Sequence, residues 1–156
     1  MSSDLRDLYQ ELILDHQKRP RNYRKLEAPN RVMRGVNPLC GDSLELQLNV
    51  EDGVVKDIGF EGSGCAISKS SASMMTERIK GKPVAEAIEI FGRFHHMLTE
   101  GAPSEADEEA LGKLAVFAGV REYPARVKCA TLAWQTLKAA LESDAPLPDV
   151  GNVSTE

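Results

Sequence analysis

Residues 43–50 alternate strictly between apolar and polar side chains. The apolar positions are Leu44, Leu46, Leu48 and Val50, and the polar ones between them are Glu45, Gln47 and Asn49. A period of two is typical of a β-strand that buries one face. The following Asp52-Gly53 is a hairpin turn signal, and residues 54–60 fit the returning strand. The chain is therefore expected to contain an antiparallel hairpin with one polar face.

Around this hairpin the spacing of apolar residues predicts mainly helices. They are expected over residues 4–17, 66–80, 83–98, around 111–117, and from 125 or 128 to 141, with a break at 119–124 and a short strand at 31–36. This order predicts an α+β fold, in which a small antiparallel sheet packs against helices. One domain should cover residues 1–142, and the Pro-, Asp- and Ser-rich residues 143–156 should form a frayed tail.

Composition excludes several classes of function. The chain of 156 residues has a formal net charge of -5, whereas a nucleic-acid-binding protein needs a basic face. No apolar run approaches the roughly 20 residues that span a bilayer, and the N-terminus lacks the pattern of a signal peptide. We therefore expect a cytoplasmic protein without nucleic-acid or membrane partners. Three cysteines, an odd number, make a disulfide framework a poor fit to such a compartment.

The three cysteines are the candidate functional residues. Isolated cysteines are commonly small buried residues, and the chain has no C-x-x-C pair. However, Cys40, Cys65 and Cys129 all fall in predicted loops or helix starts beside Gly or Lys. The hairpin should bring the loops of Cys40 and Cys65 together, and Asp42 adds a carboxylate. Three thiolates and a carboxylate suit tetrahedral zinc and could also hold an iron–sulfur cluster.

The histidines are weaker candidates for metal ligands. His95 and His96 are adjacent on a predicted helix, where neighbouring residues point about 100° apart, so a role on the helix surface is favoured. His16 comes at the end of the first predicted helix and is expected to interact with the negative end of its dipole.

Four motifs, in this order, resemble one protein family. They are Asp15-His16 with Pro20-Arg21-Asn22, Asn37-Pro38-Leu39-Cys40-Gly41-Asp42, Gly62-Ser63-Gly64-Cys65-Ala66-Ile67-Ser68, and Arg126-Val127-Lys128-Cys129-Ala130-Thr131-Leu132. Over about residues 8–141 the chain resembles the NifU/IscU group of iron–sulfur cluster assembly proteins. IscU-type scaffolds have His where this chain has Lys128, and Leu-Pro-Pro-Val-Lys where it has residues 122–126. They also have fewer than its 63 residues between the second and third cysteines. In Lys128 and in the long insertion the chain is similar to the SufU type.

The resemblance implies a function in iron–sulfur cluster biogenesis and a zinc ion held by Cys40, Asp42, Cys65 and Cys129. The implied partner is a pyridoxal-phosphate-dependent cysteine desulfurase of the SufS type, with a downstream Suf scaffold or apo-protein as acceptor. Cys40 is expected to leave the zinc and attack the desulfurase persulfide, because Gly41 makes its loop the most mobile. This is a sulfurtransferase-like activity. Arg126 is expected to position the partner or the persulfide.

Two alternatives stay open. In the first, the same four residues hold a transient [2Fe–2S] cluster, and the protein is a scaffold that passes it to apo-proteins. Lys128 and the insertion favour the sulfur carrier over this scaffold. In the second, the zinc is structural and the domain mediates protein contacts, so that replacing Cys40 would leave activity unaffected.

Overall fold

The computed structural model describes residues 3–101, 104–142 and 151–154. Helices and strands follow one another in this order: α1 (Ser3–Lys18), β1 (Arg31–Asn37), β2 (Asp42–Glu51), β3 (Val54–Ser63), α2 (Ala66–Ile79), α3 (Val84–Thr99), α4 (Glu105–Leu111), the 3-10 helix η1 (Gly112–Glu122), α5 (Pro124–Glu142) and β4 (Gly151–Ser154). The α+β class and the strand–helix order predicted from the sequence are confirmed.

The sheet has the strand order β3-β2-β1-β4. Strands β1, β2 and β3 are antiparallel neighbours, and the predicted turn joins β2 to β3 with positive φ angles at Asp52 (53°) and Gly53 (73°). Strand β4 was not predicted, and it pairs in parallel with β1. Of the expected tail, residues 143–150 and 155–156 lie outside the described residues.

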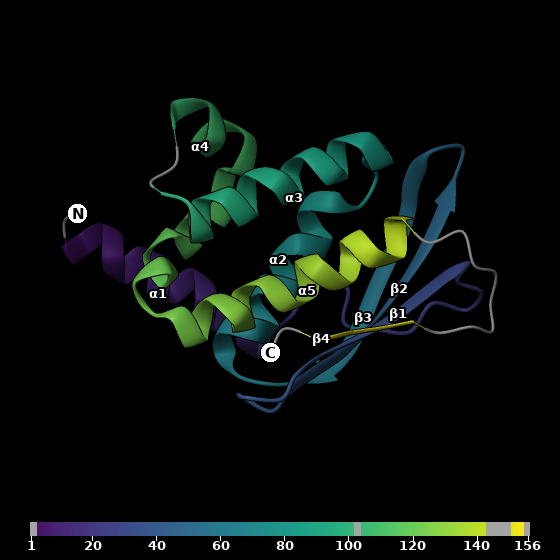
Figure 1. The fold of residues 1–156 in the computed structure, drawn as a ribbon, viewed down its shortest axis with the longest axis horizontal. Helices are drawn as coiled ribbons and strands as arrows, with labels where there is room; N and C mark the ends of the chain where they lie inside the picture. The colour runs from purple at the N-terminus through teal and green to yellow at the C-terminus, as the bar shows by residue number, and fades with distance from the viewer. Residues whose placement is uncertain (1–2, 102–103, 143–150, 155–156) are drawn as a thin grey trace.

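Helices α2 and α5 lie on one face of the sheet, with α3 on the far side of this helical layer (Figure 1). Gly35 allows α5 to approach β1 closely, because a Cβ atom at position 35 would collide with Thr136 Oγ1 and lie 3.1 Å from Leu132 Cδ1. The helix that carries Cys129 is thereby held against the strand that leads to Cys40.

The core lies between the sheet and the helices. From the sheet it takes the predicted apolar face of β2, where Leu46 and Leu48 are completely buried. The opposite face is polar but not fully exposed to solvent. Gln47 on this face is buried, and its Oε1 accepts a hydrogen bond of 2.7 Å from the Leu26 N–H. The segment between α1 and β1 therefore covers part of the outer face.

The predicted helix break at residues 119–124 is present but shorter than predicted, because only Tyr123 separates η1 from α5. The chain changes direction earlier, at Gly112, whose φ of 56° is in the left-handed region that favours glycine. It then continues as η1 through Gly119 to Glu122, and Pro124 begins α5. Proline is favoured at the first helical position, since its missing N–H is not needed there.

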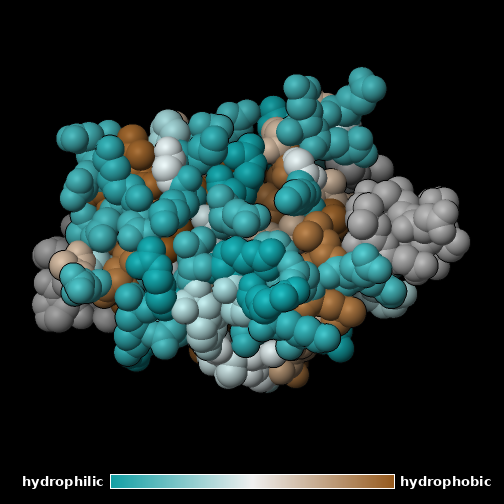
Figure 2. Space-filling view, turned by 180° about the vertical axis from the view of Figure 1, so that it is seen from behind, coloured by the Kyte–Doolittle hydropathy of each residue, from teal (hydrophilic) through white to brown (hydrophobic). Residues whose placement is uncertain are grey.

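Within the described ranges, no helix is both long and apolar enough to cross a bilayer. The face in Figure 2 is mainly hydrophilic, with hydrophobic areas separated by polar ones. Exposed large apolar side chains include Leu39 and Tyr123, at 69% and 61% exposure.

Candidate metal centre

Cys40 lies at the tip of the hairpin that joins β1 to β2. Its backbone N–H donates to the Asn37 carbonyl at 3.3 Å and closes a turn. Gly41 follows with a φ of 70°, which a residue with a side chain adopts only at a cost, and this angle turns the chain into β2. The Cys40 thiol is half-buried, so it is held by the loop and remains open to solvent.

Asp42 is the first residue of β2 and is only 2% exposed. Its Oδ1 accepts a hydrogen bond of 2.9 Å from the backbone N–H of Cys65, which ties the start of β2 to the start of α2. Gly64 leaves room for this carboxylate, because a Cβ atom at position 64 would lie 2.6 Å from Oδ1. The carboxylate is therefore buried in a fixed orientation.

The other two cysteines come from helices. Cys65 is the N-cap of α2, and its sulfur accepts a 3.4 Å hydrogen bond from the Ser68 N–H. Cys129 is completely buried in α5, and its thiol donates to the Ala125 carbonyl at 3.6 Å. A strand loop and two helices thus each supply one thiol.

The fold brings three of the four predicted ligands together. One ligand atom from each of Cys40, Asp42 and Cys129 lies within 4.8 Å of the other two, and this is the one such group in the described part of the chain. The Cys65 sulfur lies outside this mutual spacing, although its backbone binds Asp42. Two sulfurs and a buried carboxylate oxygen, with a third thiol next to them, are donors that suit zinc.

The electrostatics of the site also suit a cation. Burial raises the pKa of the Cys129 thiol far above its usual range, and the neighbouring Asp42, Cys40 and Cys65 raise it further. A bound divalent cation favours the thiolate form in such a setting. The exposed Arg126 faces the same cluster, since Cys129 and, more weakly, Cys65 and Cys40 raise the pKa of its guanidinium.

Two further residues shape this site, Asn37 and Gly64, and neither was a predicted site residue. Asn37 is completely buried and pairs across the sheet with Asp42. The predicted strand ended at residue 36, one residue before the end of β1. A strand extended to Asn37, with a loop over residues 38–41, would have predicted the pairing with Asp42. The contact of Gly64 with Asp42 depends on the packing of α2 against β2, which leaves no local signal.

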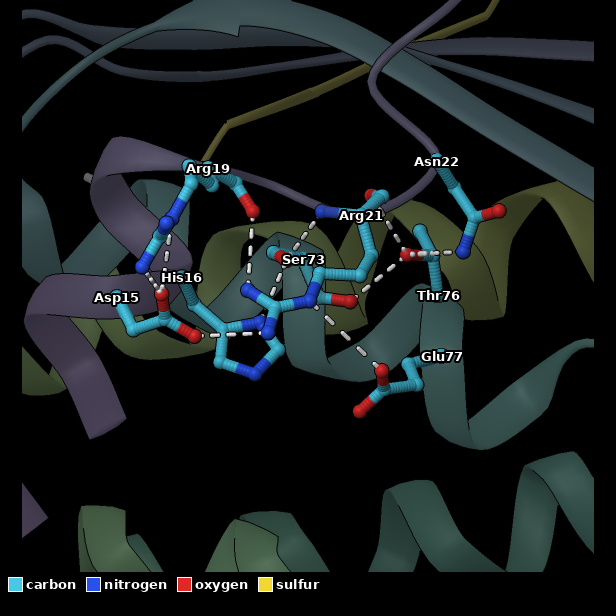
Figure 3. A network of polar contacts seen from close by, with 8 residues as sticks. All are labelled: Asp15, His16, Arg19, Arg21, Asn22, Ser73, Thr76 and Glu77. Atoms are coloured by element: carbon cyan, nitrogen blue, oxygen red, sulfur yellow. Dashed lines mark hydrogen bonds and ion pairs between the residues drawn. The ribbon is translucent and has the colours of Figure 1, made fainter.

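His16 has a different environment from the one predicted. Its ring is only 1% exposed, and Nδ1 lies 2.7 Å from Ser73 Oγ of α2 (Figure 3). The same hydroxyl accepts the Arg21 backbone N–H at 2.8 Å. Arg21 also pairs with Asp15 at 2.7 Å. The motif around His16 therefore fastens α1 and the segment after it to α2, the helix that Cys65 caps.

The remaining histidines lie on α3, as predicted. His95 stacks on Phe91 with ring centroids 5.8 Å apart, and His96 is exposed. In the described residues, neither belongs to a group of potential metal ligands.

The burial of His16 predicts that the protein is less stable in mild acid. Burial lowers the pKa of its imidazole, and the charges of Arg21 and Lys113 act in the same direction, whereas Glu77 and Asp15 oppose them. The unfolded chain therefore binds a proton more readily than the folded one. The stability contribution is complete above the unfolded value of about 6.5 and is lost as the pH falls toward the lower folded value. We therefore expect the urea concentration at the unfolding midpoint of the wild-type protein to be lower at pH 5 than at pH 7.

The matched variants for this test are His16→Gln and His96→Gln. The first should remove the part of the fall that His16 causes, and the second should keep the wild-type slope. Asp15 does not confuse the comparison, because hydrogen bonds from Arg21 and Arg19 lower its pKa and move its titration to more acid pH. Equal slopes in wild type and His16→Gln would contradict the prediction.

Comparison with known proteins places this chain in a family. A family model described as the NifU-like N terminal domain matches residues 8–130. The chain is 39% identical over 143 residues to the iron–sulfur cluster assembly scaffold protein IscU of Streptococcus pyogenes, covering 92% of this chain and 88% of that protein. It is also 39% identical over 143 residues to the zinc-dependent sulfurtransferase SufU of Bacillus subtilis, covering 92% and 95%.

A solved structure agrees with these relatives. It is described as an iron–sulfur cluster assembly scaffold protein for the SUF system, FiSufU, from Fervidobacterium islandicum. It superposes with a TM-score of 0.80 at 36% identity, over 90% of this chain and 100% of that one. The chain therefore belongs to the NifU/IscU family of iron–sulfur cluster assembly proteins, as a SufU-type member built on the NifU-like N-terminal domain.

Proposed function

We propose that this chain is a sulfur carrier, which accepts persulfide sulfur at Cys40 from a SufS-type cysteine desulfurase. The observation that carries the proposal is the position of the Cys40 thiol. It is half-buried at a hairpin tip, and it lies within 4.8 Å of ligand atoms of the buried Asp42 and Cys129. A sulfur acceptor needs a thiolate that is stabilised while idle and accessible to a partner.

In this proposal Cys40, Asp42, Cys65 and Cys129 hold a zinc ion. The ion would supply the positive charge that keeps the buried thiols deprotonated. The hydrogen bond from Ser68 to the Cys65 sulfur is compatible with ligation, because metal-bound sulfurs commonly accept hydrogen bonds. Asp42 is held for ligation by the N–H of Cys65.

The transfer itself is a thiol–disulfide type exchange. The Cys40 thiolate attacks the outer sulfur of the desulfurase persulfide, and a new S–S bond forms on Cys40. The bond between that outer sulfur and the desulfurase cysteine breaks, and the cysteine leaves as a thiolate. The step uses no oxidant or reductant, because one S–S bond replaces another.

The residue before Cys40 suits contact with a protein partner, because Leu39 is apolar and 69% exposed. Arg126 adds a positive charge beside the cysteine cluster, which suits an anionic persulfide. An exposed apolar side chain and an arginine are both residue types that binding surfaces favour.

A second candidate function is the scaffold for a [2Fe–2S] cluster. It is favoured by the relative from Streptococcus pyogenes, which is named a scaffold and is as similar as the sulfurtransferase. The four residues would then hold the cluster as cargo. In this case Cys40 remains a ligand and accepts no persulfide sulfur.

One experiment separates the two functions. The protein is purified without added metal, its zinc, iron and acid-labile sulfide are measured, and it is mixed with a SufS-type desulfurase and cysteine. We expect about one zinc per chain for a site of this type. Mass spectrometry should locate one added sulfur atom on Cys40, and a thiol reductant should remove it. In Cys40→Ser the added sulfur and the stimulation of the desulfurase should be lost.

The opposite outcome would favour the scaffold. Iron and acid-labile sulfide in place of zinc, with passage of a cluster to an apo-ferredoxin and no sulfur on Cys40, would overturn the sulfur carrier. Full desulfurase stimulation by Cys40→Ser would do the same and would support a structural zinc domain.

A further inference from the structure

Asn37 is a buried polar residue in the wall of the candidate metal centre. It is the last residue of β1 and lies opposite Asp42 in the strand register. Its exposure is 0%, although the loop that follows it reaches the surface. Pro38 disfavours a helical backbone in the preceding residue, so the sequence keeps Asn37 extended and in the ladder. Its backbone is therefore held both by the pairing with β2 and by the following proline.

The Asn37 amide donates to two of the candidate ligands. Its Nδ2 lies 3.4 Å from Asp42 Oδ2 and 3.5 Å from Cys129 Sγ. A carboxylate and a thiolate are both acceptors, so the amide must present its N–H groups to them. Its Oδ1 is buried and has no hydrogen-bond partner in the described part of the chain.

This arrangement is poorly explained by folding alone. A buried acceptor without a partner costs about 1–3 kcal/mol, which an apolar side chain of similar size would avoid. Two hydrogen bonds of Nδ2, to Asp42 Oδ2 at 3.4 Å and to Cys129 Sγ at 3.5 Å, offset this cost. They gain strength when their acceptors carry full negative charge, as ligands of a cation do.

The Asn37 amide can offset part of the negative charge of the metal ligands. Three thiolates and one carboxylate around a divalent ion leave an excess of negative charge in a mostly buried site. Hydrogen bonds from neutral donors relieve this excess and orient the ligands. The Cys65 N–H does so for Asp42 Oδ1, and the Ser68 N–H does so for the Cys65 sulfur. Asn37 reaches Asp42 Oδ2 and Cys129.

We infer that Asn37 is a positioning residue of the metal centre. Its amide holds the Asp42 carboxylate and the Cys129 thiolate side by side as ligands for a divalent ion such as zinc, and it is not a ligand itself. The inference rests on the part of the proposed function that places a metal at these residues. It does not depend on sulfur transfer through Cys40.

The test measures metal binding directly. Wild type, Asn37→Asp and Asn37→Ala are stripped of metal, and their zinc affinity is measured by competition with a chromophoric chelator. Each is also titrated with Co²⁺, whose absorption bands report thiolate ligation and coordination geometry. We expect Asn37→Ala to lose about 10–100-fold in zinc affinity, as is usual when a partner of a metal ligand is removed. Asn37→Asp should lose more zinc affinity. Its side chain has nearly the same shape, but it replaces the N–H donor with an oxygen acceptor that faces the acceptors on Asp42 and Cys129.

Asn30→Ala is the matched control. Asn30 lies just before β1, and its side chain accepts from the Val50 N–H at 2.9 Å and donates to the Val50 carbonyl at 2.8 Å. Its replacement removes two hydrogen bonds at the other end of the same strand pair. It should lower the stability of the metal-free protein and leave the zinc affinity and the Co²⁺ spectrum unchanged.

The outcomes separate this inference from the proposed function. If both Asn37 variants have the zinc affinity and the Co²⁺ spectrum of the wild type, the inference is overturned, even if Cys40 still acquires sulfur from the desulfurase. Altered affinity and spectra in these variants would support it, even if Cys40 acquires no sulfur. Failure of the wild type to bind either ion would overturn both the inference and the zinc in the proposed function. If Asn37→Ala does not fold, the nearly isosteric Asn37→Asp decides.

Discussion

Replacing Trp134 with alanine is expected to lower the free energy of unfolding by about 3–5 kcal/mol, the usual loss for a large aromatic core residue. Trp134 is completely buried in α5 and stacks on Phe94 of α3, with ring centroids 4.7 Å apart and an interplanar angle of 22°. Phe94 in turn meets Phe117 of η1 edge to face at 5.9 Å. Truncation would therefore leave a cavity where three helices meet.

Urea unfolding followed by far-UV circular dichroism measures this loss, because Trp134 is the single tryptophan and its fluorescence disappears with it. The melting temperature should fall on the order of 10 °C for a domain of this size.

Trp134→Phe is the matched control for the same site. It keeps an aromatic ring against Phe94 and removes the indole N–H, which has no hydrogen-bond acceptor in the described part of the chain. A buried unpaired donor costs about 1–3 kcal/mol, so its removal offsets part of the lost packing. We expect a much smaller loss than in Trp134→Ala. Equal losses in the two variants would show that ring stacking is not what Trp134 contributes.

The hairpin shows what local pattern can predict. The alternation in residues 43–50 and the Asp-Gly turn predicted β2, β3 and the buried leucines, because side-chain direction alternates in any strand. The same pattern placed Gln47 on a solvated face. Its burial depends on the Leu26 N–H, which comes from a segment more than 20 residues away. Strand β4 was missed for a similar reason, since Gly151–Ser154 is short, has Val153 as its single large apolar residue, and pairs with the edge that β1 offers.

The candidate site was predictable in its residues but not in its geometry. Cys40, Cys65 and Cys129 stood out because loops and helix starts are unusual places for structural cysteines. The β2–β3 hairpin also predicted that the loops of Cys40 and Cys65 are neighbours. That Asp42 and Cys129 are buried while Cys40 is half-buried follows from the docking of α5 on β1 through Gly35, which no local pattern reports. The ligand roles themselves stay a prediction.

Replacing Gly64 with alanine is expected to weaken zinc binding by about 10–100-fold with little change in the fold. The added Cβ atom would lie 2.6 Å from Asp42 Oδ1, closer than real atoms approach. The carboxylate must then move and lose its 2.9 Å hydrogen bond from the Cys65 N–H. Chelator competition on the metal-stripped protein measures the change.

Gly92→Ala provides the comparison for a glycine that is not near the site. Gly92 lies within α3, and a Cβ atom there would meet nothing within 4 Å. Alanine should therefore raise stability by about 0.5–1 kcal/mol through its better helix propensity. Its zinc affinity should equal that of wild type.

A double-variant cycle identifies the route of the Gly64 effect. If the added methyl group acts by displacing the Asp42 carboxylate, then Gly64→Ala should cost little more in a chain that already carries Asp42→Ala. Two changes that share one target are not additive, whereas independent changes are additive to within about 0.3–0.5 kcal/mol. Additive losses would mean that Gly64→Ala disturbs Cys65 directly. If Gly64→Ala and Asp42→Ala each keep the zinc affinity of the wild type, Asp42 is not a ligand, and the protein ligands of the metal centre are the thiols.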